Sequence, residues 1–156
     1  MVTVNLFRTK RIRFALAALA FALVAAVAAQ ASWAQRLAVT APLANIRGGP
    51  GTEYDILWQV EKYFPLETIR ETGPWIFFQD FEGDRAWIHR SLVGAVTSVI
   101  TSAPTSNVRS GPGTDHDIVL KVEAGVPFRV LKQTGQWLHV EHADGDRGWI
   151  HRSLVW

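Results

Sequence analysis

The sequence predicts an all-β protein made of two small β-barrels in tandem. Three observations support this prediction. After an N-terminal segment, one unit of sequence is written twice with a constant offset of 62 residues. Within each unit, short apolar runs alternate with Gly- and Pro-containing turns about every 8–12 residues, a spacing typical of small β-sandwiches and barrels. Beyond the N-terminal segment, no stretch has the 3.6-residue periodicity of an amphipathic helix.

Residues 1–34 have the layout of a secretory signal peptide. Four basic side chains lie within residues 1–13, an apolar run extends over 14–29, and small residues follow at cleavage-like spacing, so we expect cleavage after Ala31 or Ala34. The alternative, an uncleaved membrane anchor, is disfavoured because a spanning helix needs roughly 20 apolar residues. We therefore expect a periplasmic or secreted protein with no stable membrane span after signal cleavage.

The charge balance changes once this segment is set aside. The whole chain carries 16 Lys and Arg against 14 Asp and Glu, but residues 35–156 carry 12 basic and all 14 acidic side chains. A mildly acidic exported body excludes nucleic acid as a partner. The absence of Cys excludes disulfide scaffolds, thiolate zinc sites and cysteine nucleophiles.

The internal repeat defines the domain organisation. Counting 37–93 against 99–155 without gaps gives 26 identities in 57 positions, which establishes a duplication. We assign domain 1 to residues 36–93, a linker to 94–97 and domain 2 to 98–155. Because a domain of about 60 residues without disulfides is only marginally stable alone, we expect the two units to share an interface, with Trp58 and Trp156 as candidates for it.

The second unit shows its elements in order. Runs rich in β-branched and aromatic residues predict strands, and clusters of Gly, Pro and Asp predict the turns between them. The expected strands are 99–101, 107–109, 118–122, 128–132, 137–142 and 148–151, separated by a Gly/Pro loop at 110–117, turns at 123–125 and 134–136 and a hairpin turn at 144–145, with a closing segment at 153–155.

Three separated motifs, each present twice, resemble the bacterial Src-homology-3-like domain family. They are Asn-[Ile/Val]-Arg-x-Gly-Pro-Gly-Thr, the Trp that begins the central hairpin (Trp75 and Trp137), and the closing Trp-Ile-His-Arg-Ser-Leu-Val. The resemblance implies two tandem small Src-homology-3-like β-barrels that act as an exported non-enzymatic binding module. The resemblance implies that relatives often accompany cell-wall hydrolases and hold wall peptides or proteins. Polyproline recognition is not expected, because His89 and His151 stand where eukaryotic relatives place a groove Pro.

The alternation of residues places candidate binding side chains on one face. Leu138 and Val140 take one face of their strand, so Trp137 and His139 take the other. The same count puts Trp75 beside Phe77 on the outer face of the first copy. An outward Trp beside polar groups suits a shallow binding groove, although packing across loops or in the seam between the domains remains an alternative. For Trp87 and Trp149 we favour packing in the core or the seam.

Arginines that recur in both copies are candidate carboxylate anchors, because a guanidinium binds a carboxylate through two hydrogen bonds. Internal ion pairs with repeated acids, Asp55 and Asp117 or Asp84 and Asp146, are the favoured alternative for Arg47, Arg109, Arg90 and Arg152. The predicted ligand-binding set is Trp75, Trp137, His89, His151, Arg47 and Arg109.

Other chemistry is not expected. The Gly-Pro-Gly loops lack the helix of a phosphate site and are interpreted as tight loops that need positive φ. Glu82 and Asp84 lie in a hairpin turn, and a Ser–His hydrolase at His89 or His151 would lack an orienting acid. His139 and His142 point to opposite faces of a strand and do not chelate. We expect no catalytic residues, metal or cofactor, and a module recognising cell-wall (peptidoglycan) peptides; the alternative is a periplasmic protein–protein adaptor or scaffold.

Overall fold

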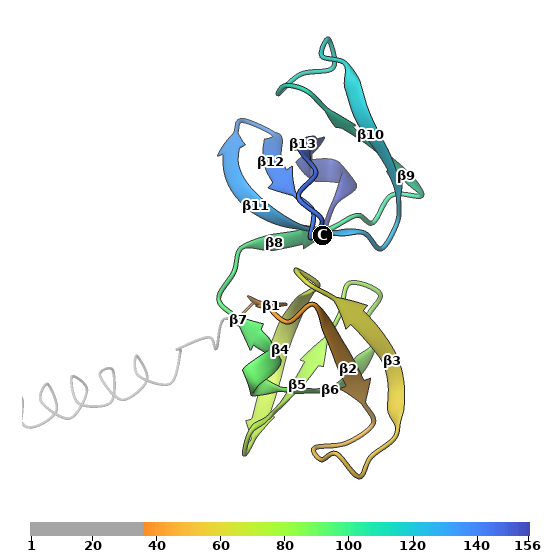
Figure 1. The fold of residues 1–156 in the computed structure, drawn as a ribbon, viewed down its shortest axis with the longest axis vertical. Coiled ribbons are helices and arrows are strands. Elements are labelled where there is room, and N and C mark those ends of the chain that lie inside the picture. The colour runs from red at the N-terminus through yellow and green to blue at the C-terminus, as the bar shows by residue number, and fades with distance from the viewer. Residues whose placement is uncertain (1–35) are drawn as a thin grey trace, which may run out of the picture. The chain divides into compact units, whose positions relative to one another are not determined.

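The computed structural model describes residues 36–156, which lie in one compact unit, so the predicted signal peptide falls outside the described residues. Strands, turns and two short 3₁₀ segments make up this part of the chain (Figure 1). The all-β prediction is therefore confirmed. Within residues 36–156, no helix is long and apolar enough to cross a membrane.

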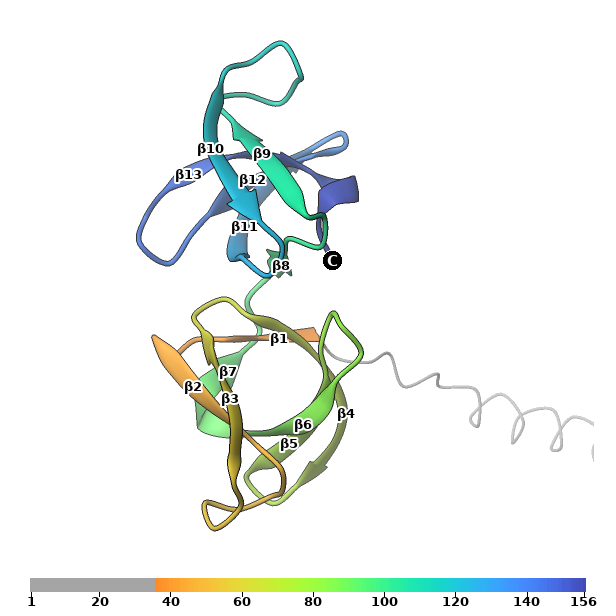
Figure 2. The same cartoon turned by 90° about the vertical axis from the view of Figure 1, so that its right-hand side faces the viewer.

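The first repeat forms an antiparallel sheet of seven strands in the order β3-β2-β6-β5-β4-β1-β7. Figure 2 shows these strands curving around a common interior. The strands are β1 (Arg36–Val39), β2 (Leu43–Arg47), β3 (Ile56–Glu61), β4 (Pro65–Thr72), β5 (Trp75–Gln79), β6 (Arg85–His89) and β7 (Val93–Gly94), with the 3₁₀ segment η1 (Arg90–Leu92) after β6.

The second repeat forms a separate antiparallel sheet of six strands in the order β10-β9-β13-β12-β11-β8. Its elements are β8 (Ser98–Ile100), β9 (Thr105–Arg109), β10 (Ile118–Glu123), β11 (Pro127–Thr134), β12 (Trp137–Glu141), β13 (Arg147–His151) and η2 (Arg152–Leu154). The strand order matches that of β1–β6, as a duplication requires. A bridge between Thr101 and Val155 and a pair of backbone hydrogen bonds between Ile100 and Trp156 hold β8 against the end of the chain.

Two-residue alternation along each strand builds the two cores. On β5, Ile76 and Phe78 are fully buried and belong to the first core, whereas Phe77 between them is only half-buried. On β12, Leu138 and Val140 belong to the second core. Because a slip of one residue would move every side chain to the opposite face, this pattern fixes the register and thereby which side chains remain outside.

The turns use glycine for two different reasons. Gly135 and Gly145 have φ of 56° and 103°, a region that residues with a Cβ rarely adopt, and they occupy the predicted turn at 134–136 and the predicted hairpin turn at 144–145. The expectation of positive φ in the Gly-Pro-Gly loops is wrong, since no glycine there has it. Instead, a Cβ on Gly49 would come within 2.3 Å of the Tyr54 ring, and one on Gly111 within 2.5 Å of the His116 ring.

The described unit contains contacts between residues of the two repeats. Ile100 of β8 is buried in the first core, and Trp156 packs against the same cluster. The Arg36 guanidinium lies 4.1 Å from the centre of the Trp156 ring. Trp58 also packs against the first core. Trp156, one of the two residues expected at the seam, is therefore in contact with the first repeat.

Candidate functional site

The outer face of the central hairpin in each repeat carries aromatic side chains at matching positions. In the first repeat, Trp75 pairs across the strands with His89, and Phe77 pairs with Trp87. In the second repeat, Trp137 pairs with His151 and His139 pairs with Trp149. We call these four-residue groups the outer aromatic rows. They confirm that Trp75 shares a face with Phe77, and Trp137 with His139.

The Trp–His pair of each outer aromatic row has the same geometry. The rings of Trp75 and His89 meet edge to face, with centroids 5.1 Å apart and planes at 85°. The rings of Trp137 and His151 do the same at 5.3 Å and 78°. Edge-to-face contact between aromatic rings is the geometry that their charge distribution favours. Trp75 is buried and Trp137 is half-buried, so the second repeat presents more of its indole to a ligand.

The second pair of each row is covered by a cation. The Arg70 guanidinium lies 4.8 Å from the centre of the Phe77 ring and 5.3 Å from that of Trp87. In the second repeat, the Lys132 ammonium lies 5.1 Å from the Trp149 ring.

Trp87 and Trp149, expected in the core or the seam, are buried, with only 7% and 8% of their surface exposed. They belong to neither of the two apolar clusters, because they point to the other face of the sheet. They lie on the outer face, where their cross-strand neighbours and the cations cover them, and the row forms a layered surface of cation and aromatic groups.

The two row histidines are fixed by the chain that follows them. Nδ1 of His89 accepts a hydrogen bond from the backbone N–H of Ser91 at 3.3 Å and lies 2.8 Å from its Oγ. His151 repeats both contacts with Ser153, at 3.4 Å and 2.8 Å. An acceptor at Nδ1 assigns the neutral tautomer with its proton on Nε2. That N–H has no hydrogen-bond partner among residues 36–156.

The contacts of His89 with Ser91 and of His151 with Ser153 can be compared with those of a Ser–His hydrolase. A Ser–His mechanism needs an acid that orients the imidazole. Among the described residues, no carboxylate is hydrogen-bonded to His89 or His151, and their Nδ1 atoms cap the 3₁₀ segments η1 and η2. The His–Ser proximity is explained by capping.

The predicted arginine anchors bind the adjoining loops. The Arg47 guanidinium donates to the carbonyl oxygens of Thr52 and Tyr54 at 3.0 Å and 2.7 Å. Arg109 donates to the carbonyl oxygen of His116 at 2.8 Å. The expected acidic partners, Asp55 and Asp117, are thus replaced by backbone carbonyls. Arg47 and Arg109 pair directly with Trp87 and Trp149 across the sheet, so they join the loop to the row.

Arg90 and Arg152 occupy equivalent positions in the two repeats but differ in their ion pairing. Arg90 forms an ion pair with Glu71, an acid other than the expected Asp84. Arg152 is offset from Arg90 by 62 residues, and Glu71 corresponds to the uncharged Gln133. No ion pair involves Arg152 within residues 36–156, which leaves its charge available.

A charged cluster beside the second row was not foreseen from the sequence. Glu141 is 8% exposed and bonds both Arg129 and Arg147. The hydrogen bonds from Arg147 and then Arg129 hold the pKa of Glu141 below its ordinary value. The pKa of His139 is also lowered, first by burial and then by the nearby charges of Lys132 and Arg147. His139 therefore favours its neutral form.

The acidic hairpin turn behaves as the turn chemistry predicts. Carboxylate oxygens of Asp80, Glu82 and Asp84 lie within 4.8 Å of one another. Oδ1 of Asp80, however, accepts hydrogen bonds from the backbone N–H groups of Glu82 and Asp84 at 3.0 Å and 2.9 Å. The buried carboxylate thus shapes the turn. In the second repeat, His142 takes the place of Asp80 and bonds Asp144 at 2.8 Å, on the far side from His139.

A family of known domains matches each of the two repeats once. The family described as "Bacterial SH3 domain" matches residues 40–94 and again 102–156. A putative N-acetylmuramoyl-L-alanine amidase, YrvJ, from Bacillus subtilis is 26% identical over 122 residues, covering 71% of this chain and 23% of the relative. A probable cell wall amidase, LytH, from Staphylococcus epidermidis is 31% identical over 55 residues, covering 35% of this chain and 19% of the relative.

The chain thus spans less than a quarter of the length of these curated relatives. Among solved structures, NlpC2 from Trichomonas vaginalis is similar over 78% of this chain and 47% of that one, with 13% identity and a TM-score of 0.35. Similarity at that level carries no argument about function.

Proposed function

The chain belongs to the bacterial SH3 domain family, and from that premise we propose that it is an exported, non-enzymatic module that binds cell-wall (peptidoglycan) peptides. The proposed contact surfaces are the outer aromatic rows. Trp75 and Trp137 contact the ligand, and His89 and His151 donate from Nε2 to a carbonyl or carboxylate oxygen. Arg47 and Arg109 hold the loops beside the rows.

One observation carries the proposal: both repeats keep the same Trp–His pair in the same geometry on their outer face. A shallow aromatic surface with fixed N–H donors and adjacent cations suits an extended peptide, which offers carbonyl oxygens, methyl groups and carboxylates.

The choice of cell-wall peptides rests on the relatives. One relative that is similar to part of this chain is named a putative N-acetylmuramoyl-L-alanine amidase, and another is named a probable cell wall amidase. The proposed compartment, periplasmic or secreted, follows from the same relatives and from the signal-like residues 1–34. Two weak sites on one chain gain affinity through effective concentration when both engage one polymer.

Sedimentation with purified cell-wall sacculi tests the proposal. The wild-type chain should sediment with the sacculi, and the double variant Trp75→Ala with Trp137→Ala should lose about tenfold or more in apparent affinity, because truncating aromatic anchors costs about 2 kcal/mol or more. Thermal melting of each variant separates lost binding from lost folding. Failure of the wild type to sediment, or equal retention of a folded double variant, would overturn the proposal.

A matched control uses apolar side chains elsewhere on the surface. Ile56 and Ile118 occupy equivalent places at the start of β3 and β10 and are 49% and 43% exposed. The double variant Ile56→Ala with Ile118→Ala removes a similar kind of apolar surface and should leave retention unchanged.

The same residues favour a second candidate function, a periplasmic protein–protein adaptor. Strands β3 and β10 are sheet edges, and each begins with two exposed apolar residues, Ile56 and Leu57 or Ile118 and Val119. Open edges of this kind accept an added strand from another protein. Crosslinking in cells should then recover one dominant protein and no wall fragments, and substitution of the edge residues should abolish that product.

A further inference from the structure

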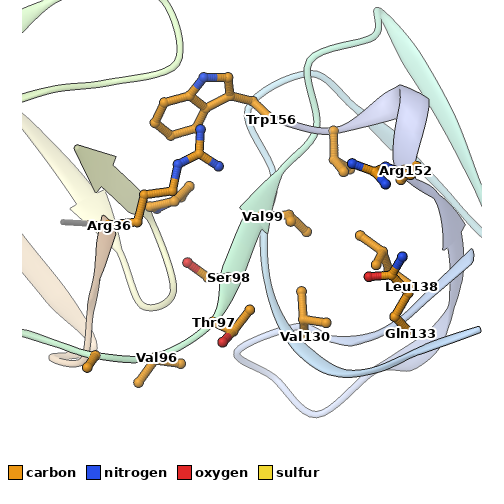
Figure 3. A pocket seen from close by; sticks show the side chains of 13 residues that line it. Arg36, Val96, Thr97, Ser98, Val99, Val130, Gln133, Leu138, Arg152 and Trp156 are labelled. Atoms are coloured by element: carbon orange, nitrogen blue, oxygen red, sulfur yellow. The ribbon is translucent and has the colours of Figure 1, made fainter. Parts of the chain in front are cut away.

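A pocket of about 610 Å³ opens beside β8 and β11, and most of its lining comes from residues 95–156 (Figure 3). Its apolar walls are formed by Val99, Val130, Leu138 and Trp156. Leu138 follows Trp137 on β12 and therefore faces away from the outer aromatic row. The pocket is a second site, separate from the surface proposed above.

The polar group that distinguishes this pocket is Arg152. Its equivalent in the first repeat, Arg90, is neutralised by Glu71. In the second repeat Gln133 stands in place of that acid, and its amide nitrogen donates to the carbonyl oxygen of Gly135 at 2.8 Å. The exchange of Glu for Gln therefore leaves the Arg152 guanidinium with an uncompensated positive charge.

The other arginine at the pocket does not add to that charge. Two guanidinium nitrogens of Arg36 bond Glu67 at 3.0 Å and 2.9 Å, while the guanidinium plane lies over Trp156. Arg36 thus serves as part of the wall. No Asp or Glu lines the pocket, and Arg152 is the one charged side chain among the lining residues that has no ion-pair partner within residues 36–156.

We propose that this pocket binds the free C-terminal carboxylate of a short peptide with small apolar side chains. The carboxylate would pair with Arg152 through the two-pronged geometry that guanidinium groups offer. Methyl-sized side chains would occupy the wall of Val99, Val130 and Leu138. The volume lies within the range of small-ligand pockets and accommodates a few residues.

The hydroxyls of Thr97 and Ser98 supply the remaining polarity. Both residues line the pocket, and their side chains are shown at its rim in Figure 3. Neither hydroxyl has a side-chain partner within the described part of the chain. Ser98 precedes Val99 on β8, so its hydroxyl lies on the Arg36 side of that strand, opposite the Val99 wall (Figure 3).

The test uses N-acetyl-Ala-Ala as the free acid and as its C-terminal amide, titrated into the full mature chain. Binding is followed by the amide NMR signals of Val99 and Val130 and by Trp156 fluorescence. The acid should bind about tenfold or more tightly than the amide, because the amide lacks the negative charge and so loses the charge-assisted hydrogen bonds to Arg152. Equal binding of acid and amide, or no binding of either, would overturn the proposal.

Substitutions then assign the charge to Arg152. Arg152→Gln should reduce affinity for the acid about tenfold, and Gln133→Glu should do the same by restoring the ion pair that the first repeat contains. Arg90→Gln, the matched change in the first repeat, should leave affinity unchanged. All three side chains are exposed or half-exposed, so the variants should fold, and thermal melting verifies this. Undiminished binding by Gln133→Glu would contradict the assignment.

The stereochemistry of the probe identifies the source of the ligand. Tighter binding of the D-Ala-D-Ala acid supports a cell-wall peptide, and tighter binding of the L-Ala-L-Ala acid supports the chain end of a protein. Because sacculus retention depends on Trp75 and Trp137, whereas this binding depends on Arg152, failure of one proposal is distinguishable from failure of the other.

Discussion

The imidazole of His139 stacks on the indole of Trp149, with ring centroids 4.9 Å apart and 26° between the planes. The equivalent rings in the first repeat, Phe77 and Trp87, lie 5.0 Å apart at 41°. A titratable ring has thus taken the place of a permanently neutral one in an otherwise repeated stack. Protonation of that ring would place a third positive charge beside Lys132 and Arg147.

His139 should make the protein sensitive to mild acid. The pKa of His139 is lowered from 6.5 in the fold. As the pH falls below 6.5, the unfolded chain therefore binds a proton more readily than the folded chain, and the free energy of unfolding decreases until the native pKa is passed. His139→Phe should remove this part of the pH dependence. Thermal melting between about pH 7.5 and about pH 5 measures it. Phe77→His should introduce a similar loss in the first repeat, and an unchanged pH profile for His139→Phe would contradict the prediction.

Glu141 should govern stability at lower pH. Because Arg147 and Arg129 lower its pKa from 4.5, its contribution is present above that value and is lost as the pH falls through the native pKa. Glu141→Gln should lower the melting temperature at neutral pH and flatten its decline in acid. Gln79→Glu, at the equivalent place, should gain less than Glu141 supplies, because the new carboxylate would pair with Arg85, which already bonds Gln79 at 2.9 Å, but would face Glu67 where Glu141 faces Arg129. Equal acid sensitivity in Glu141→Gln and wild type would count against this role.

Gly148 should not tolerate even a methyl group. A Cβ there would lie 2.5 Å from Cγ1 of Val108 and 2.9 Å from the backbone oxygen of Arg109. Overpacking of this kind costs about 1–3 kcal/mol, so Gly148→Ala should lower the free energy of unfolding by that amount in urea titrations. The first repeat accommodates Ala86 at this position, and Ala86→Gly serves as the reverse control. A neutral Gly148→Ala would show that Val108 can move aside.

Tyr63 should stabilise the protein despite its backbone conformation. It has φ of 72°, where its equivalent Gly125 has 88°. Such a conformation costs about 1–3 kcal/mol for a residue with a side chain, but the buried ring also lies 5.7 Å from the Arg129 guanidinium. Loss of a buried aromatic costs about 3–5 kcal/mol. Tyr63→Gly should therefore be destabilising on balance.

Gly125→Ala provides the comparison for that experiment. A Cβ at Gly125 would meet no atom within 4 Å, so this substitution measures the backbone cost alone, about 1–2 kcal/mol. If Tyr63→Gly proved stabilising in chemical denaturation, backbone relief would outweigh the packing of the ring.

The fold followed from local sequence signals because β-alternation and glycine turns are local properties. The run at 118–122 predicted a strand that the structure places at Ile118–Glu123. The Asp144-Gly145 pair predicted a turn in which Gly145 has positive φ. Trp149 follows the same alternation: Ile150 beside it faces the core, so Trp149 points to the outer face, where its neighbours bury it.

The partners of charged side chains were less accessible to sequence reasoning. Arg47 bonds carbonyl oxygens of a loop whose path depends on the whole repeat. Glu141 meets Arg129 across a register that shifts at an irregularity between Val130 and Lys132. Neither relation is encoded in spacing along the chain. The same holds for the pocket at Arg152, although the change from Glu71 to Gln133 is visible when the repeats are aligned.

The strand order has a consequence for how the protein is made. In the first repeat, β1 pairs with both β4 and β7, and β2 pairs with β6, so the sheet is complete only once Gly94 is available. In the second repeat, Ile100 near its start bonds Trp156. A chain that emerges from a ribosome or a translocation channel can therefore complete the sheet of its first repeat while the second is still being delivered, although Ile100 and Trp156 join the first core only later. Early completion keeps two stretches of nearly the same sequence from exchanging strands, a characteristic misfolding route of tandem repeats.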